Sequence, residues 1–349
     1  MSVNLETLSF GLTPQEASND NRQQPLVPEG QTEFSQTTSS VIMVKPTYFG
    51  YNPQAAKTNH FQHDLDGELT QEEVNRRAQE EFETLVAKLR AKFIDVLLIE
   101  DTPLPHTPDA IFPNNWMSTH QTERGPALVT YPMLNDNRRQ ERRKLDEIIG
   151  KLRKDNHTKI KLVRMDQIEN QGQILEGTGS LVLDRTHGIT YACISARTTP
   201  GGVDHFEKNS PYDAIRFHAV DIDDNPIYHT NVVMSVGTNY VVICLDAIPN
   251  EFERETLKRS FEKNGKEIIE ISRQQMDNFC GNILELENIF GGHLLVMSDT
   301  AFNAFNEKQL TTYKRLNLEV THSSLDIIEK VGGGSARCTI AEDHTIPRY

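Results

Sequence analysis

The sequence around Cys338 is one in which a thiol can act as a nucleophile. Three consecutive glycines, 332–334, and Arg337 precede this cysteine. Glycines leave backbone amides accessible, and a nearby cation favours the thiolate, which is the reactive form of cysteine. The same pattern fits a C-terminal strand cysteine whose glycines only make a turn. Both interpretations stay open on these residues alone.

His229 and Glu176 are candidates for moving a proton during such chemistry. His229, in IYHTN, begins an apolar stretch, where an imidazole can face a cleft and exchange protons near neutral pH. Glu176, in LEGTGS, precedes an expected strand and can orient His229 or hold a cationic substrate. Taken singly, a histidine at a strand edge is more often structural, and Glu176 is equally typical of a turn.

Two other motifs do not predict a ligand site. No lysine follows GTGS (177–180), and this segment precedes a strand rather than a helix, so the physical basis for cradling a phosphate is missing. His60 and His63 have no suitable third metal ligand near them. We therefore expect neither a metal nor a nucleotide or other organic cofactor.

These candidates lie in a chain that alternates short strands with helices, which predicts the α/β class. A capping box at Thr70 and Glu73 begins the clearest helix. Its apolar face is formed by Val74, Phe82, Val86, Leu89 and Phe93. Further helices are predicted over 137–154 and 249–265. Strands are predicted over 40–46, 94–101, 160–165, 189–195, 232–236, 240–245, 267–271 and 293–298.

Composition limits the classes of protein to consider. Lys and Arg number 36 against 50 Asp and Glu, and the net charge of -14 argues against a nucleic-acid partner. No apolar run approaches the roughly 20 residues of a membrane span, and the first residues lack the parts of a secretory signal, so a cytoplasmic location is expected. The four cysteines form no CxxC pair and are expected to be reduced.

Residues 1–40 are too polar to fold and are expected to be a disordered tail, with one domain over 41–349.

Several phrases taken together resemble the guanidino-group-modifying superfamily, which includes arginine deiminase, dimethylarginine dimethylaminohydrolase and the amidinotransferases. Within it, the chain is similar to the citrulline-utilisation-hydrolase type. The phrases are TPDAIFPNNW, YPMLNDNRRQERR, LEGTGSLVLDR, YACISART, IYHTNVVMSVG and GGGSARC. The resemblance runs from IMVKP to the C-terminus. It implies a five-bladed, pseudosymmetric α/β propeller (the pentein fold), with the active site in its central channel and no cofactor.

The resemblance also implies roles for the chemical groups. Cys338 would be the nucleophile, His229 the proton carrier and Glu176 its acidic partner. A planar N–C–N carbon is a poor electrophile, so such a site would proceed through a covalent adduct on sulfur. The adduct would then be hydrolysed, or passed to an amine in an amidinotransferase.

The resemblance further implies how an amino-acid substrate would bind. Asp109 would hold the head group, and Arg138 and Arg197 match positions that bind the amino-acid carboxylate, for which an arginine fork is suited. Without the resemblance, both arginines would be taken as solvated surface groups. The expected partner is thus a small amino acid, and a homo-oligomer is compatible with the sequence.

Three asparagines depart from the pattern of relatives that carry acids: Asn114, Asn115 and Asn231. A guanidinium group offers only donors, whereas a ureido group also has a carbonyl oxygen, to which an amide can donate and a carboxylate cannot. The substitution favours a ureido substrate, and predicts hydrolysis of citrulline to ornithine, CO2 and ammonia. Alternatively, Asn114 and Asn115 only brace the loop beside Trp116. Arginine or a methylated arginine would then be the substrate. An amidinotransferase and a non-catalytic binding protein are the remaining hypotheses.

Overall fold

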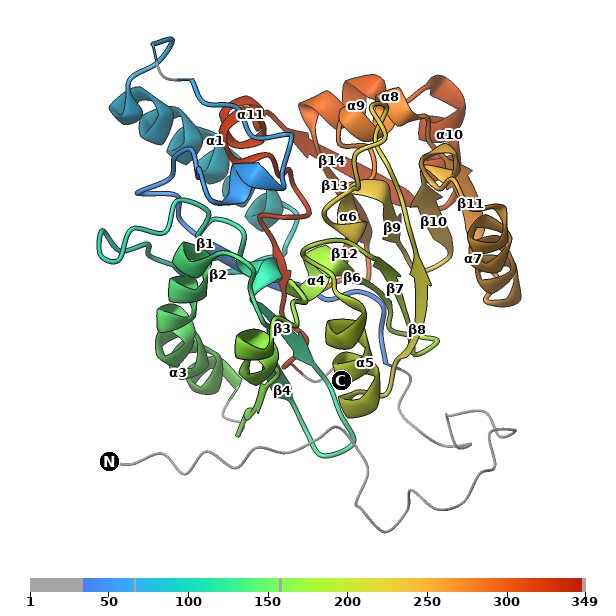
Figure 1. Ribbon diagram of the computed structural model, residues 1–349, viewed down its shortest axis with the longest axis horizontal. Coiled ribbons are helices and arrows are strands. Elements are labelled where there is room, and N and C mark those ends of the chain that lie inside the picture. The colour runs from blue at the N-terminus through green and yellow to red at the C-terminus, as the bar shows by residue number, and fades with distance from the viewer. Residues whose placement is uncertain (1–33, 66, 157–158, 347–349) are drawn as a thin grey trace.

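The computed structural model describes residues 34–65, 67–156 and 159–346. Five three-stranded sheets surround a common centre, and helices cover the outside (Figure 1). This arrangement is the five-bladed α/β propeller expected from the sequence. No helix among the described residues is long and apolar enough to cross a membrane.

Each sheet repeats one pattern, in which the middle strand pairs antiparallel with an inner strand and parallel with an outer strand. Contacts between β15 and β3, β6 and β9, and β9 and β12 join the inner strands around the centre. From inner to outer, the sheets are β15 (Ala341–Glu342), β1 (Ser40–Val44) and β2 (Asp95–Ile99); β3 (Met117–His120), β4 (Ala127–Thr130) and β5 (Lys161–Arg164); β6 (Leu181–Asp184), β7 (Ile189–Cys193) and β8 (Asp213–Phe217); β9 (Met234–Val236), β10 (Tyr240–Ile243) and β11 (Glu267–Glu270); and β12 (Leu284–Glu287), β13 (His293–Ser298) and β14 (Leu318–Ser323).

The two ends of the described chain meet in one sheet and close the ring. Val41 pairs with Glu342, and Ile42 pairs with Ala341. Just before β1, the buried Gln36 donates from Nε2 to the carbonyls of Leu183 and Val236, at 2.9 and 3.2 Å. Residues 34–40 are therefore packed against the sheets, contrary to the disorder expected for them. Residues 1–33 of the expected tail lie outside the described residues.

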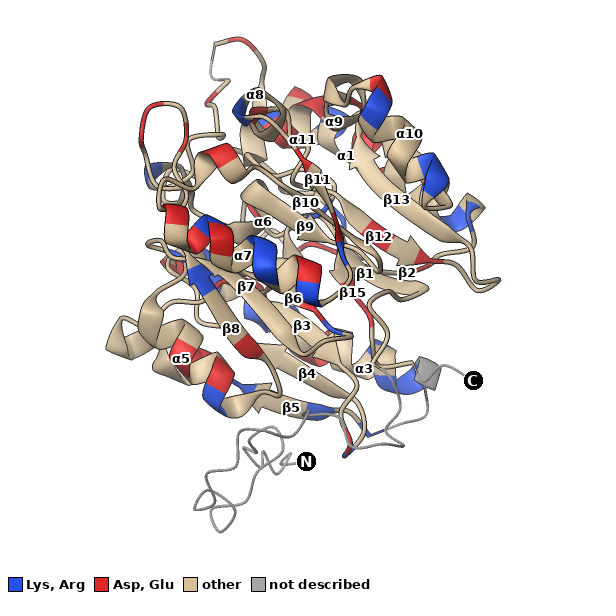
Figure 2. Cartoon of the chain, turned by 90° about the vertical axis from the view of Figure 1, so that its right-hand side faces the viewer, with Lys and Arg blue, Asp and Glu red and all other residues tan. Residues whose placement is uncertain are grey.

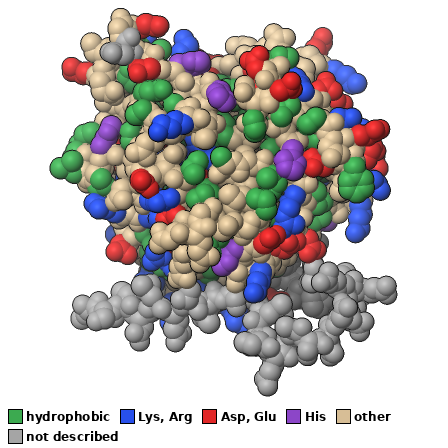
Figure 3. All heavy atoms as spheres, in the orientation of Figure 1, with side chains coloured by type: hydrophobic (Ala, Val, Ile, Leu, Met, Phe, Trp, Pro, Cys, Tyr) green, Lys and Arg blue, Asp and Glu red, His purple; other side chains and the backbone are tan. Residues whose placement is uncertain are grey.

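The longer helices pack on the outside of the sheets. They are α1 (Gln71–Ala91), α3 (Leu145–Asn156), α5 (Pro200–Asn209), α7 (Glu251–Lys263), α10 (Glu307–Arg315) and α11 (Asp326–Gly332). Lys, Arg, Asp and Glu residues are frequent on helices such as α5 and α7 and sparse on most of the strands, as Figure 2 shows. Acidic and basic side chains are interspersed on the face seen in Figure 3. An apolar face was predicted from the sequence for the segment that forms α1.

Helix α1 begins at the predicted cap, and the Thr70 side chain accepts a hydrogen bond from the Glu73 amide. The carboxylate of Glu73 binds Arg76 and Arg77. The expected apolar face is buried except for Phe93, which lies beyond the helix end at φ 63° and is 54% exposed. Phe93 was therefore wrongly assigned to that face, because the helix ends before it.

The predicted helix over 137–154 is three consecutive elements: α2 (Asp136–Arg139), a 3-10 turn (Gln140–Lys144) and α3. Arg138, Glu141 and Lys144 in the first two are buried, although helical periodicity alone would place such charges in solvent. Tertiary contacts to the centre of the propeller therefore determine the shape of this segment.

Candidate active site

Five turns, each directly before an inner strand, gather near the centre of the propeller (Figure 1). They are Pro113–Asn115 before β3, α4 (Gly177–Ser180) before β6, α6 (Thr230–Val233) before β9, residues 278–283 before β12, and residues 335–340 before β15. Helix α4 packs against both Pro113–Asn115 and α6. These turns carry, or directly follow, the predicted residues Asn114, Asn115, Glu176, His229, Asn231 and Cys338.

Glycines in α4 permit this close packing. Gly177 has φ +45°, and a Cβ atom there would lie 2.3 Å from the carbonyl oxygen of Asn114. A Cβ atom on Gly179 would lie 2.5 Å from Asn115 Nδ2 and 2.8 Å from His229 Nδ1. All three distances are too short for a real Cβ atom. The glycines of GTGS thus bring three turns together.

Glu176 and His229 form a buried pair, with 2.8 Å between Oε2 and Nε2. Burial alone would raise the pKa of Glu176, but Arg197 and His229 together lower it to about 2. Burial lowers the pKa of His229 to about 4, although Glu176 opposes this. Near neutral pH the pair is therefore a carboxylate and a neutral imidazole. Because a carboxylate only accepts, His229 donates from Nε2 and keeps the lone pair on Nδ1.

Asp109 is buried, and both of its carboxylate oxygens receive amide donors. Asn52 Nδ2 lies 2.7 Å from Oδ2, and Gln62 Nε2 lies 3.3 Å from Oδ1. Burial raises the pKa of Asp109, while nearby Arg138 opposes the shift. Sequence reasoning missed Asn52 and Gln62, because amides in a polar segment carry no signal without a known partner.

Arg138 is buried at the centre, but its guanidinium is already engaged. Nε and Nη2 donate to the two oxygens of Glu141 at 2.8 and 3.1 Å, and Nη1 donates to Asn115 Oδ1 at 2.8 Å. The fork that was expected to bind a substrate carboxylate therefore binds Glu141. Sequence reasoning missed Glu141 because the predicted helix would have exposed it.

Arg197 is likewise an interior residue and not a solvated one. Nε donates to Thr58 Oγ1 at 2.8 Å, and Nη2 donates to the Ala55 carbonyl at 2.7 Å. Nη1 lies 3.5 Å from Glu176 Oε2, and the guanidinium carbon lies 4.9 Å from the centre of the Tyr228 ring. Arg197 thus links the segment before α1 to the Glu176–His229 pair.

Cys338 is 4% exposed and lies among amide groups. Its Sγ is 3.2 Å from Asn282 Nδ2 and 3.5 Å from Asn231 Nδ2. Burial raises the pKa of the Cys338 thiol, and the Asn282 hydrogen bond opposes this shift most strongly. As the sequence suggested, the charge of Arg337 opposes the rise in the pKa of Cys338, but no hydrogen bond joins its guanidinium to the sulfur. Arg337 donates to the Ile340 carbonyl and to Glu342, each at 2.8 Å.

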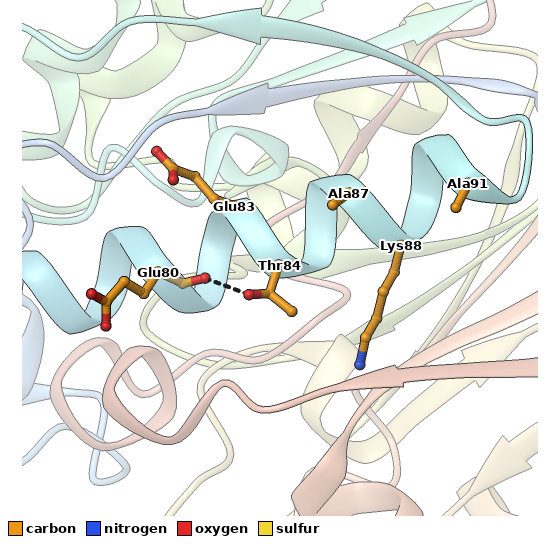
Figure 4. Close-up of a pocket in the computed structure, with 6 residues that line it drawn as sticks. All are labelled: Glu80, Glu83, Thr84, Ala87, Lys88 and Ala91. Carbon is orange, nitrogen blue, oxygen red and sulfur yellow. Dashed lines mark hydrogen bonds between the residues drawn. The ribbon is translucent and has the colours of Figure 1, made fainter.

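A separate depression lies on the outer face of α1 (Figure 4). It is lined only by Glu80, Glu83, Thr84, Ala87, Lys88 and Ala91 of that helix. All six are exposed, and Thr84 Oγ1 donates to the carbonyl of Glu80 at 2.7 Å. This surface has none of the buried reactive groups found at the centre of the propeller.

Among the described residues, no cluster of three or more His, Cys, Asp or Glu side chains is arranged to hold a metal ion. The sulfurs of Cys193, Cys244, Cys280 and Cys338 form no disulfide.

The family model described as "N,N dimethylarginine dimethylhydrolase, eukaryotic" matches residues 45–345. No curated protein sequence matches the chain.

Solved structures share the fold at low sequence identity. ArgZ, an arginine dihydrolase from the ornithine–ammonia cycle in cyanobacteria, superposes with a TM-score of 0.68 at 14% identity, over 89% of this chain and 41% of ArgZ. This chain thus spans about two fifths of the length of ArgZ. The N-terminal domain of ArgZ has also been solved separately, as a cysteine-to-serine mutant bound to substrate. That domain has a TM-score of 0.65 and 15% identity to this chain, over 88% of this chain and 98% of the domain.

A cysteine-to-serine mutant of dimethylarginine dimethylaminohydrolase from Pseudomonas aeruginosa, complexed with citrulline, has a TM-score of 0.58 and 15% identity, over 88% of this chain and 99% of the other. Because the family match spans most of the sequence, the chain belongs to the family "N,N dimethylarginine dimethylhydrolase, eukaryotic", in the pentein-fold superfamily of guanidino-group-modifying enzymes.

Proposed function

We propose that this protein is a hydrolase that acts on the ureido carbon of citrulline and forms ornithine, CO2 and ammonia through a covalent adduct on Cys338. The observation that carries the proposal is the set of amide groups, those of Asn114, Asn115 and Asn231, at three positions where the resemblance leads one to find acids in relatives. Asn231 Nδ2 lies 3.5 Å from Cys338 Sγ. The buried Nδ2 of Asn114 has no hydrogen-bond acceptor among the described residues. An unengaged N–H donor suits the carbonyl oxygen of a ureido group.

Asp109 supplies the complementary acceptor for the N–H groups of the substrate. Its oxygens accept from the amides of Asn52 and Gln62, and the ureido N–H groups would compete with these two donors. The head group is then held by a carboxylate on its nitrogens and by an amide on its oxygen. This combination distinguishes a ureido group from a guanidinium group, because each polar atom finds a partner of the opposite type.

His229 generates the nucleophile. Burial raises the pKa of the Cys338 thiol and lowers the pKa of His229 to about 4, so both groups are neutral before reaction. The thiol proton passes to His229 as sulfur attacks the ureido carbon, and Glu176 stabilises the imidazolium that forms. The C–S bond forms, one C–N bond breaks, and His229 gives its proton to the leaving nitrogen.

Water completes the reaction. His229 takes a proton from a water molecule that attacks the thiocarbamate carbon, and the C–S bond breaks to regenerate the Cys338 thiol. The carbamate released loses CO2. One water is consumed in total for each citrulline converted to ornithine, CO2 and ammonia.

Related proteins support the covalent route. Substrate is bound to a cysteine-to-serine mutant of the ArgZ N-terminal domain, and an asparagine-to-serine mutant of that domain is covalently bound to a reaction intermediate.

Arginine or dimethylarginine hydrolysis is the second candidate. The family description and the buried carboxylate of Asp109 favour it, because a guanidinium group binds carboxylates. An amidinotransferase would use the same covalent intermediate with an amine in place of water. A non-catalytic binding protein ranks last, since the reactive side chains lie together.

We also propose that residues 41–349 act as one catalytic domain, which the pairing of β1 with β15 supports. A cytoplasmic location is supported by the four unpaired cysteines.

Steady-state assays with citrulline, arginine and dimethylarginine at equal concentration test the substrate. We expect turnover of citrulline with release of ornithine. Turnover of arginine alone would rule out the ureido proposal. Mass spectrometry of an acid-quenched reaction should find a carbamoyl-type adduct on the Cys338 peptide. An adduct with the mass of an amidino group would indicate a guanidino substrate. Product analysis with and without added glycine would show whether the group is transferred to an amine.

A further inference from the structure

The turn before β12 carries a buried polar residue to which the proposed function assigns no role. Asn282 is 2% exposed and lies in the turn that corresponds, around the propeller, to those of Asn115, Glu176, His229 and Cys338. The neighbouring sequence, NFCGNILEL, has no motif that singled it out.

The Asn282 amide contacts two neighbouring turns. Its oxygen contacts the turn that carries Cys338, and its nitrogen contacts both that turn and the turn that carries Asn231. Oδ1 accepts from the backbone amides of Ser335 and Cys338, each at 3.3 Å. Nδ2 donates to Cys338 Sγ at 3.2 Å and to the Asn231 carbonyl at 3.1 Å. The side chain thus ties the backbone of the cysteine turn to the sulfur itself.

The chemistry of these contacts requires an amide. A carboxylate can accept from the two backbone amides, but it has no N–H for the sulfur and would repel a thiolate. A hydroxyl group is too short to reach both sides of the turn. The cationic groups do not replace this donor, because Arg337 is bound to Ile340 and Glu342. An N–H group that donates to an anion stabilises it more than it stabilises the neutral form.

We propose that Asn282 is a positioning residue that holds Cys338 Sγ in place and stabilises the thiolate as it forms. This inference rests on the proposed function of Cys338 as nucleophile. It extends that function, because it identifies a side chain whose N–H donor makes the buried thiol easier to ionise. Asn231, the second donor at 3.5 Å, has the longer contact.

The test is the pH dependence of Cys338 alkylation in the full chain. Iodoacetamide is added between pH 6 and 11, and modification of the Cys338 peptide is followed by mass spectrometry. Asn282→Asp keeps the acceptor for the turn but removes the donor and adds a negative charge. We expect the alkylation midpoint to rise by about one pH unit or more, with the rate at neutral pH about tenfold lower.

Asn278→Asp is the matched control, because it makes the same change in the same turn. The Asn278 side chain donates to the Gln274 carbonyl on the exposed side of α8 (Arg273–Asp277). Its alkylation profile should superimpose on that of the unmodified sequence. In citrulline turnover, Asn282→Asp should lower kcat with little change in KM, since the residue acts on the sulfur and not on the substrate.

The proposal is overturned if the Asn282→Asp profile coincides with the original, or if Asn278→Asp shifts the midpoint equally. If Asn282→Asp does not fold, Asn282→Ser takes its place. It lacks the charge and the N–H donor, and the same upward shift is expected. Alkylation needs no substrate, so this result is independent of citrulline turnover. Should complete alkylation of Cys338 leave catalysis intact, the proposed function fails while the Asn282 measurement still stands.

Discussion

Arg138 and Glu141 form a two-bond ion pair in the interior, with Nε to Oε1 at 2.8 Å and Nη2 to Oε2 at 3.1 Å. Their side chains are 2% and 0% exposed. Arg138 also donates to Asn115 and to the Phe112 carbonyl, so the pair anchors the turn that carries the asparagines. The Arg138 guanidinium is thus bound by a carboxylate of the protein itself. Arg138 therefore supports the turn that carries the asparagines.

This relationship predicts a large stability loss for Glu141→Gln. Removing one partner leaves a buried charge uncompensated, which costs about 3–5 kcal/mol. Urea unfolding measures the difference. Asp136→Asn is the control, because Asp136 pairs with Arg139 at 2.7 Å but its side chain is 81% exposed. That pair should contribute less than about 1 kcal/mol. Equal losses in the two variants would contradict the interior role.

Replacement of Cys338 by serine should reduce turnover to background without weakening the fold. Serine is close in size to cysteine but is a far weaker nucleophile at this site. Turnover and thermal unfolding are measured on the same preparation. Cys193→Ala, in the core of β7, should retain activity and lose only stability. Retained turnover in the Cys338 variant would redirect the search for the nucleophile.

Gly179→Ala should damage the site through a single methyl group. The added Cβ would lie 2.5 Å from Asn115 Nδ2 and 2.8 Å from His229 Nδ1, so these side chains must move. We expect kcat to fall at least about a hundredfold, because small displacements of reacting groups are costly. Gly150→Ala in α3 meets no atom within 4 Å and should leave kcat unchanged. Similar kinetics in both variants would show that the packing of α4 is unimportant.

Asn114→Asp should shift substrate preference from citrulline towards arginine. The change removes the N–H donor and supplies a carboxylate, which a ureido oxygen repels and a guanidinium attracts. The ratio of kcat/KM for citrulline to that for arginine should fall about tenfold or more. Asn209→Asp, whose Nδ2 binds the His205 carbonyl at the end of α5, is the control for added charge. An unchanged ratio would favour the bracing role of Asn114.

Stability should fall as the pH is lowered from about 6.5 towards 4. The pKa of His229 is lowered from 6.5 to about 4 by burial, so the unfolded chain takes up a proton before the folded chain does. The loss from this group is on the order of 3 kcal/mol. Below that range Glu176, with its pKa lowered from 4.5 to about 2, adds a further loss. Urea unfolding at pH 7.5 and 5 should show a smaller difference for His229→Asn, and an equal difference would exclude His229 as the cause.

The local sequence determined the kinds of chemical group and many of the elements. Thr70 caps α1 because its hydroxyl reaches the Glu73 amide within one turn. The two partners are close in sequence, so the local sequence is sufficient to predict this contact. The glycines around Glu176 and before Cys338 marked the turns that need close approach. Resemblance supplied the propeller, and the five repeated sheets confirm it.

Tertiary structure alone decided which groups meet. Asn282 lies 56 residues from Cys338 in sequence, and Asn52 lies 57 residues from Asp109, so neither contact appears in any local pattern. Arg337 is adjacent to Cys338 in the chain but turns towards Glu342, whereas distant Asn282 donates to the sulfur. The reason is physical: periodicity specifies which side of an element is buried, but hydrogen-bond partners depend on how the five sheets close around their centre.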